Sequence, residues 1–365
     1  MYLQTKIKVT SIIAFAVFAG AFLVPKGLMQ TQTQTPPASQ VETAGQKFKN
    51  IKVLNEMPAD QLGKVMNLMS ASLGFNCAGC HISGDKDFDK DGNQHKEAAR
   101  KMIRMTWELN KQFFDGKPEV SCNTCHNGHE RPVALPNLNP VAAPEERPKQ
   151  PDVKPTIDQI LDKYTTALGG KENLAKVTSR TIKASRVEPG GKAMEPESIW
   201  QKSGKLRVDT AYPNYLVAEI FDGKAAWKRG NKEEIILRTD ESEQIKREAQ
   251  LFANPDLKGV FTKLDFRFVD RIDGKEVYLV IGSLADNTRE RLYFDATTGL
   301  LVRRNASSMT VLGAFQYQVD YSDYKDFGGV KLPATIRFAV PSISWTRKII
   351  EVKNNASVDD KMFVK

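Results

Sequence analysis

The sequence predicts a multidomain chain of the α+β class, in which a small α-helical domain precedes a mainly antiparallel β half-barrel with an N-terminal helix. Apolar residues recur at helical spacing in two segments before residue 113, which indicates amphipathic helices. After about residue 177, alternating segments separated by turn residues indicate strands. Between the two regions, residues 132–155 contain seven prolines, which favour an extended, semi-rigid linker.

Residues 1–24 have the form of a signal peptide or a membrane anchor. Lys6 and Lys8 precede an apolar run over residues 9–24, and no acidic residue occurs in this segment. The run is short for a bilayer span, which needs about 20 residues. We expect an exported, periplasmic chain, and a cleaved signal and an uncleaved inner-membrane anchor are the two alternatives. Residues 25–44 are rich in Gln, Thr and Pro and are expected to be a disordered linker.

The net charge of +9 does not indicate a nucleic-acid partner. Basic and acidic residues are interspersed in both domains, and no basic run or interleaved aromatic stripe occurs. We therefore expect a mixed, solvated surface.

Two helices are predicted in the first domain, residues 45–131. The first lies between Pro58 and Gly74, because proline suits the first turn of a helix and glycine the position just after its end. The second runs from about residue 96 to residue 112. Their apolar stripes are Leu62, Val65, Met66, Met69 and Leu73 in the first helix, and Ala99, Met102, Ile103, Thr106, Leu109 and Phe113 in the second.

All the cysteines of the chain lie in two copies of the motif C-x-x-C-H. This is the attachment pattern of c-type haem, because two thiols three positions apart can bond both vinyl groups of one porphyrin. The histidine that follows is then held as the proximal iron ligand. The sequence thus predicts two covalent c-type haems, bound through Cys77 and Cys80 with His81, and through Cys122 and Cys125 with His126.

Other uses of the cysteines fit the pattern less well. A compact zinc ribbon would have to close a loop of 41 residues between the two motifs. A thioredoxin-like dithiol would follow a strand, whereas each motif here follows a predicted helix and turn. Structural disulfides would leave the two following histidines unexplained.

Each motif also follows a helix that carries methionine. Histidine with methionine is an axial pair for haem iron and raises its reduction potential. We predict Met66 and Met102 as the sixth ligands, although methionines at such positions also serve as core filler. Which methionine of each helix ligates the iron stays open. We expect the other two histidines, His95 and His129, to be solvated surface residues.

An acidic segment between the motifs resembles the beginning of a calcium-binding loop. Asp87, Asp89 and Asp91 precede Gly92, but the twelfth position, where a bidentate glutamate is needed, is Ala98. We therefore interpret this segment as a charged surface turn.

The helical domain resembles the cytochrome c subunit of photosynthetic reaction centres. The matching stretches are MPADQLGKVMNLMSASLGFNCAGCH, AARKMIRMTWELN and VSCNTCHNGHERP. The resemblance implies a methionine-bearing helix before each haem segment, in agreement with Met66 and Met102. That subunit carries four haem motifs and this chain has two, so the resemblance implies a dihaem electron carrier of a non-photosynthetic type.

The second domain, residues 156–365, is expected to begin with a helix that ends at Gly169 and Gly170, followed by a short helix. Asp222-Gly223 and Asp273-Gly274 are typical of hairpin turns, and a polar helix near residues 241–252 interrupts the strands. Near-sequential antiparallel strands predict a meander that curls into a half-barrel. The predicted strands are YLVAEIF, EVYLVIGSL, RERLYF, GLLVRRN, FQYQVDY and ATIRFAV.

The second domain contains no cysteine or histidine, which excludes the commonest metal ligands and catalysis by these residues. Its segments ALGGKENLAKV, YFDATTGLLVRR and DYSDYKDFGGVKLPATIRF are similar to lipoprotein-carrier half-barrels of the LolA/LolB type. That resemblance implies a lipid or lipoprotein as a partner. A structural or docking domain is the alternative.

Together, these observations predict an exported dihaem cytochrome that transfers single electrons between redox partner proteins of the periplasm or membrane. Two other classes stay open. One is a haem enzyme or sensor, which needs an open iron site. The other is a lipid- or lipoprotein-binding protein with an accessory haem domain.

Overall fold

The computed structural model describes residues 42–82, 87–132, 148–188, 193–231, 234–235, 239–253 and 256–364. The expected signal or anchor, residues 1–24, lies outside the described residues, as do most of the two expected linkers. Within the described part of the chain, no helix is long and apolar enough to cross a membrane.

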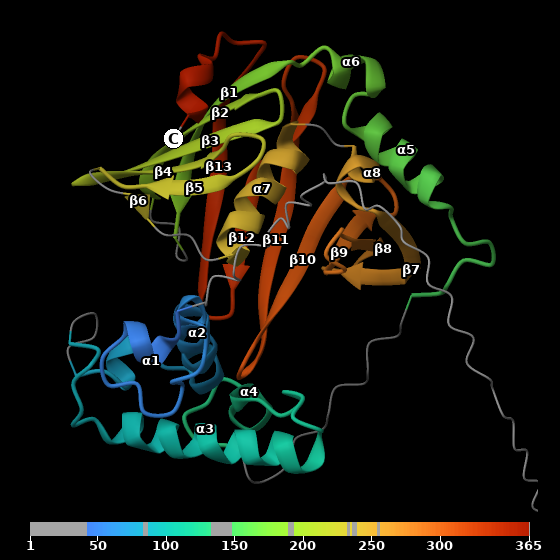
Figure 1. The fold of residues 1–365 in the computed structure, drawn as a ribbon. Coiled ribbons are helices and arrows are strands. Elements are labelled where there is room, and N and C mark those ends of the chain that lie inside the picture. Colours follow the sequence, from blue (N-terminus) through green and yellow to red (C-terminus); the bar gives the residue numbers. More distant parts are fainter. Residues whose placement is uncertain are drawn as a thin grey trace, which may run out of the picture. The chain divides into compact units, whose positions relative to one another are not determined.

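The first described region is helical (Figure 1). Both predicted helices are confirmed, and Gly74 ends the first of them in the left-handed conformation at φ 69°. The second helix begins after Asn93, whose side-chain oxygen accepts a hydrogen bond from the backbone N–H of His95. The elements are α1 (Ala44–Lys47), η1 (Ala59–Gln61), α2 (Leu62–Leu73), η2 (Cys77–Gly79), α3 (Gln94–Phe113) and α4 (Cys122–His126).

The buried face of α3 differs from the predicted apolar stripe. The prediction placed Met102 and Phe113 inside, but their side chains are 42% and 64% exposed. Apolar periodicity misplaced the face because polar residues are buried where hydrogen bonds satisfy them. Met66 is only partly buried against the core of this region, whereas Met69 is buried in it. The buried residues of α3 are Arg100, Ile103, Thr106 and Asn110.

The second region is an open antiparallel sheet with helices, so the predicted α+β class with a half-barrel is confirmed. Its helices are α5 (Ile157–Ala167), α6 (Lys171–Ala175), α7 (Thr239–Ala253) and α8 (Leu257–Val260), with the short turn η3 (Asp360–Phe363) near the end. The strands are β1 (Ser179–Val187), β2 (Ala193–Lys202), β3 (Lys205–Tyr212), β4 (Tyr215–Phe221), β5 (Ala226–Arg229), β6 (Glu234–Ile235), β7 (Lys263–Ile272), β8 (Lys275–Ser283), β9 (Arg289–Asp295), β10 (Leu301–Thr310), β11 (Gly313–Asp326), β12 (Lys331–Val340) and β13 (Ile343–Asn354).

The strand order is β6-β5-β4-β3-β2-β1-β13-β12-β11-β10-β9-β8-β7, which is two meanders joined where β1 pairs with β13. Asp222-Gly223 lies between β4 and β5, and Asp273-Gly274 joins β7 to β8, as predicted. Because β6 and β7 are at opposite edges, the intervening chain must cross the sheet. The segment that crosses contains α7, which packs against β2 to β5, and α8. Figure 1 shows α7 lying across one face of the sheet.

Buried ion pairs attach α7 to the sheet. Arg247 on α7 pairs with Glu290 at 3.0 Å, and Arg304 approaches the same carboxylate at 3.0 Å. A second group joins Arg347 to both Glu197 and Glu248. Removing one member of such a group is costly, because the others then keep an uncompensated buried charge. The polar helix predicted from the sequence is therefore α7, and some of its charged side chains point toward the interior.

The turn between β10 and β11 contacts the helical region. Leu312 is 1% exposed and packs with Val65 and Leu68 of α2. The indole Nε1–H of Trp107 donates a hydrogen bond to the carbonyl of Val311 at 3.2 Å. The sheet thus contributes a side chain to the core of the helical region.

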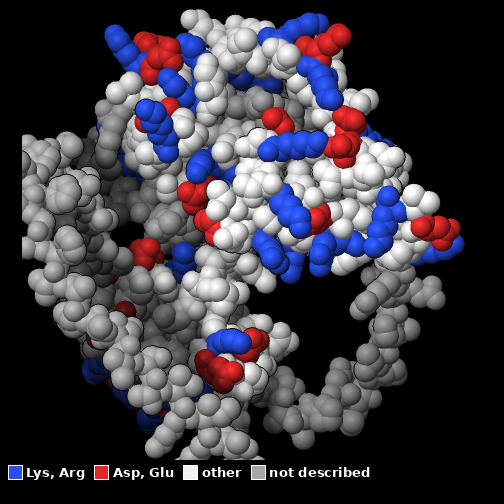
Figure 2. Space-filling model, turned by 45° about the vertical axis from the view of Figure 1, so that its right-hand side comes forward, with Lys and Arg blue, Asp and Glu red and all other residues white. Residues whose placement is uncertain are grey.

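Charged residues are mixed at the surface, as expected. On the face shown in Figure 2, Lys and Arg side chains are interspersed with Asp and Glu. Many are paired, for example Lys171 with Asp162 at 3.1 Å. Such exposed pairs stabilise the fold little.

We predict that Glu290→Gln destabilises the protein by about 3–5 kcal/mol, because Arg247 and Arg304 lose their carboxylate in the interior. Urea unfolding at neutral pH measures this change. The control is Asp162→Asn, which breaks an exposed pair and should change the unfolding midpoint little.

The same carboxylate should contribute to acid sensitivity. Burial alone would raise the pKa of Glu290, but Arg304 and Arg247 together lower it below its ordinary value. A lowered carboxyl pKa adds stability above the unfolded value of about 4.3, and this contribution is lost as pH falls through the folded value. Between neutral pH and the acid range, stability should thus fall less steeply in Glu290→Gln than in the wild type. Equal slopes would contradict this assignment.

Candidate haem site

The first motif forms a single tight turn. Cys77 to Gly79 make up η2, and the backbone N–H groups of Cys80 and His81 both donate hydrogen bonds to the carbonyl of Cys77. The thiols of Cys77 and Cys80 are free, the first exposed and the second partly so. Burial raises the pKa of Cys80. The turn thus brings both thiols and the histidine onto a few consecutive residues, with the thiols accessible to a reactant.

The second motif is the short helix α4. Ser121 and Thr124 form a capping box at its start, and Asn127 ends it in the left-handed conformation at φ 45°. Cys122 and Cys125 are also free thiols, partly exposed and exposed, respectively. Both motifs therefore carry two free thiols and a histidine, the first on a 3-10 turn and the second on a short α-helix.

The loop after α4 packs against the end of α2. The N–H of Gly128 donates a hydrogen bond to the carbonyl of Ser72 at 2.8 Å. A Cβ atom at Gly74 would lie 2.4 Å from the carbonyl oxygen of Gly128, so this approach requires glycine at position 74. Gly74 thus ends α2 and also makes room for the second motif.

The two histidines that are predicted to be proximal ligands, His81 and His126, are held in different ways. Nδ1 of His126 lies 3.0 Å from the carbonyl oxygen of His129, and since a carbonyl only accepts, Nδ1 must carry the proton. In the neutral ring this tautomer leaves the lone pair on Nε2, the nitrogen that is then available to a metal. His129 itself is exposed, and His95 is partly exposed, in line with the expected surface positions.

The ring of His81 packs edge to face on Phe88, with centroids 4.9 Å apart. Its Nδ1 is buried without a hydrogen-bond partner. Burial lowers the pKa of His81, and the charge of Lys96 lowers it further, while a weaker backbone interaction with Phe88 acts in the opposite direction. The imidazole is therefore kept neutral, as a metal ligand must be.

Exposed apolar residues near the first motif and on α3 are compatible with a large apolar ligand. Ile82 and Phe88, close to the first motif in sequence, are exposed, and so are Met102 and Met105 on α3. Exposed apolar side chains of this kind can be covered by a bound ligand. Among the described residues, no cluster of three or more His, Cys, Asp or Glu could hold a metal ion. A haem needs none, because the porphyrin supplies the equatorial iron ligands.

Two asparagines, which the sequence reasoning missed, tie the motifs to the two ends of α3. The side chain of Asn110, 4% exposed, donates to the carbonyl of Val120 at 2.8 Å and accepts from its N–H at 2.9 Å. Asn93 donates to the carbonyl of Gly79 at 3.2 Å and caps the helix. An asparagine before a helix is a recognisable cap, but nothing in the sequence marks Asn110.

The acidic segment before α3 is a charged surface turn, as interpreted. The carboxylate of Asp91 lies 2.7 Å from Lys52 Nζ and 3.0 Å from Arg100 Nη1. Hydrogen bonds from Lys52 and then from Asn50 lower the pKa of Asp91 well below its usual range. Basic side chains thus occupy the position where a cation would have to bind.

We predict that Asn110→Ala destabilises the protein by about 1–3 kcal/mol, since both backbone groups of Val120 lose their buried partner. Thermal unfolding measures the loss, and hydrogen exchange at the Val120 amide locates it. Asn110→Asp keeps the acceptor and should protect that amide better than Asn110→Ala does. Unchanged protection in Asn110→Ala would show that the two hydrogen bonds do not hold this segment.

Comparison with solved structures finds similarity to the β-rich second domain of this chain. A LolA superfamily protein from Nitrosomonas europaea is 13% identical, with a TM-score of 0.42 over 58% of this chain and 99% of that one. A putative outer membrane lipoprotein-sorting protein domain from Vibrio parahaemolyticus is 8% identical, with a TM-score of 0.37 over 56% of this chain and 97% of that one.

Comparison with protein families and curated proteins concerns the helical region. Residues 24–158 match the family described as photosynthetic reaction centre cytochrome C subunit. The photosynthetic reaction center cytochrome c subunit of Roseobacter denitrificans is 31% identical over 120 residues, which are 30% of this chain and 32% of that protein. Cytochrome c-554 of Chloroflexus aurantiacus is 34% identical over 84 residues, 21% of this chain and 20% of that protein. The chain thus spans a third or less of the length of these relatives. The helical region of this chain is thus similar to cytochromes c.

Proposed function

We propose that the protein is an exported dihaem c-type cytochrome that transfers single electrons between redox partner proteins of the periplasm or membrane. The observation that carries this proposal is the pair of C-x-x-C-H motifs, each with two free thiols and a following histidine. In the second motif, the imidazole has its non-coordinating nitrogen fixed by a carbonyl, as proximal haem ligands require.

The residue roles follow from the two motifs. Cys77 and Cys80 would bind one haem, and His81 would be its proximal ligand. Cys122, Cys125 and His126 would serve the second haem in the same way. When bound, haem supplies the one-electron chemistry, while the chain orients it and limits the access of water. The carbonyl of His129 accepts a hydrogen bond from Nδ1–H of His126 and so orients the imidazole. This hydrogen bond also raises the basicity of Nε2, the nitrogen that would bind the iron.

Met66 and Met102 complete the proposed ligand sets. Met66 lies on α2 at the edge of the helical core, and Met102 lies on the exposed flank of α3. Both α2 and α3 pack against α4, so the methionine helices and the second motif lie together. Two closed irons of this kind favour electron transfer, because a haem enzyme or sensor needs an open or displaceable sixth position.

A lipid in the interior of the half-barrel is not part of this proposal. The space beside Glu248, Arg304 and Tyr317, where α7 faces the sheet, has a volume of only about 10 Å³. The ion pairs of Arg304 and Arg347 occupy the same region. An acyl chain there would have to displace α7 and leave these charges unpaired, at a cost of several kcal/mol.

We predict that Met66→Leu and Met102→Leu each leave one iron open to carbon monoxide, because leucine cannot ligate iron. The absorption spectrum of the reduced, mature protein, with and without the gas, measures this. Met69→Leu and Met105→Leu are the matched controls on the same helices and should leave the spectrum unchanged. A wild-type spectrum that shifts with the gas would favour the enzyme or sensor alternative.

We also predict that the mature protein carries the mass of two haems. The double variant Cys122→Ser, Cys125→Ser should carry one, because the first motif keeps both of its thiols. Mass spectrometry of the denatured protein counts only covalently bound groups. A wild-type mass with one haem or none would contradict the dihaem proposal.

A further inference from the structure

The histidines of the two cysteine motifs differ in what their Nδ1 atoms contact. Nδ1 of His126 donates a hydrogen bond to the carbonyl of His129 at 3.0 Å, whereas Nδ1 of His81 is buried without a hydrogen-bond partner. A metal-binding histidine usually donates its other ring N–H to a carbonyl or a carboxylate, which raises the basicity of the nitrogen that binds the metal. The two motifs therefore do not offer equivalent imidazoles to a haem iron.

A carbonyl that lies beside His81 is already bound by another side chain. The ring of Phe88 packs on the ring of His81, with centroids 4.9 Å apart, and the Phe88 backbone is close enough to act on the pKa of His81. However, Nζ of Lys96 donates one hydrogen bond to the carbonyl of Phe88 at 2.9 Å and another to the carbonyl of Lys90 at 2.7 Å. Lys96, near the beginning of α3, thus occupies an acceptor beside the imidazole.

Asp91 compensates the charge of Lys96 only in part. The carboxylate of Asp91 lies 3.6 Å from Nζ of Lys96, but it also lies 2.7 Å from Nζ of Lys52 and 3.0 Å from Nη1 of Arg100. A second carboxylate, that of Glu97, pairs with Arg100. Three basic side chains thus share two carboxylates in this group, and the carbonyls that bind Lys96 carry no formal charge. The group is left with an excess of positive charge.

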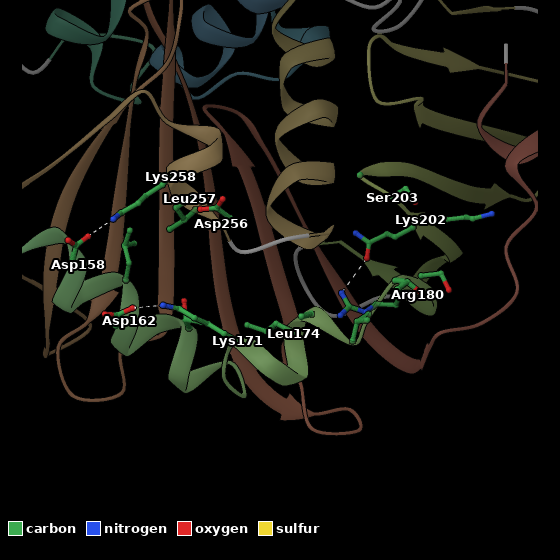
Figure 3. A pocket seen from close by; sticks show the side chains of 18 residues that line it. Asp158, Asp162, Lys171, Leu174, Arg180, Lys202, Ser203, Asp256, Leu257 and Lys258 are labelled. Atoms are coloured by element: carbon green, nitrogen blue, oxygen red, sulfur yellow. Dashed lines mark hydrogen bonds and ion pairs between the residues drawn. The ribbon is translucent and has the colours of Figure 1, made fainter.

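The surroundings of Lys96 also make its charge effective. On the half-barrel, Lys171 pairs with Asp162 at 3.1 Å in solvent (Figure 3), where screening makes such pairs weak. The side chain of Lys96 is only 13% exposed, so its field is screened less. In agreement, burial and then the charge of Lys96 lower the pKa of His81. The charge of Lys96 therefore acts at the imidazole.

We propose that Lys96 is a positioning residue of the first motif and makes a haem bound at Cys77 and Cys80 easier to reduce than a haem bound at the second motif. Because Lys96 holds the carbonyl of Phe88, His81 stays the weaker electron donor. The charge of Lys96 also disfavours ferric iron, which carries one more positive charge than ferrous iron. The couple takes up one electron and no proton. The inference rests on the proposed function, since it needs a haem at each motif.

The test is a spectroelectrochemical titration of the full-length, haem-loaded protein. We expect two different potentials in the wild type. The double variants Cys122→Ser, Cys125→Ser and Cys77→Ser, Cys80→Ser each keep one motif and so assign one potential to each haem. The haem of the first motif should have the higher potential. Equal potentials, or the reverse order, would overturn the proposal.

Variants of Lys96 test its role directly. Lys96→Met removes the charge and the donor but keeps an unbranched side chain. It should lower the equilibrium constant for reduction of the first haem by about threefold or more and leave the second haem unchanged. Lys96→Arg keeps both the charge and the donors, so it should stay close to the wild type. Lys101→Met is the matched control, because Lys101 is exposed on the same helix.

The outcomes separate this inference from the proposed function. Circular dichroism and the mass of the denatured protein check that each variant is folded and carries its haems, and Lys96→Gln replaces Lys96→Met if the latter does not fold. An unchanged potential of the first haem in the folded variant, or an equal fall in Lys101→Met, would refute the role of Lys96 and leave the cytochrome proposal intact. A wild-type protein without covalent haem would refute both.

Discussion

The hydrogen bonds at the two ends of α3 are the constraint on which the arrangement of the two cysteine motifs depends. Neither η2 nor α4 is long enough to be stable alone, since isolated helices shorter than about 12 residues are marginal in water. Asn93 connects one end of α3 to Gly79, and Asn110 connects the other end to Val120. Because a helix rises about 1.5 Å per residue, the two asparagines are roughly 25 Å apart along the axis. A stiff element, and not a loop, thus sets the separation of these two attachment points.

The sequence predicted what depends on local chemistry. Gly74, the paired cysteines and the Asp-Gly turns have fixed local meanings, and the structure confirms the helix end and the turns that they predict. The inner face of α3 was predicted only in part. Ile103 and Thr106 are buried as predicted, but Met102 and Phe113 are exposed. Asn110 was missed because its partner, Val120, lies ten residues further along the chain. The pairing of β1 with β13 was not predictable either, since it joins residues more than 150 positions apart.

The polar helix α7 shows a related limit. From the sequence alone, its charges suggest a solvated surface, and only the crossing from β6 to β7 brings them against Arg304, Arg347 and Glu290. Such groups contribute little net stability compared with apolar packing, but they disfavour any arrangement that leaves one charge unpaired. They therefore fix the place of α7 on the sheet.

The proline-rich segment separates the two regions along the chain, but Leu312 joins their cores. Its side chain is almost fully buried among residues of α1, α2 and α3, and Trp107 donates to the neighbouring carbonyl of Val311. A small helical region has little apolar core of its own, so each additional buried side chain matters, at about 1.5–3 kcal/mol for a leucine. Removal of the sheet would expose this core. The half-barrel therefore supports the helical region physically.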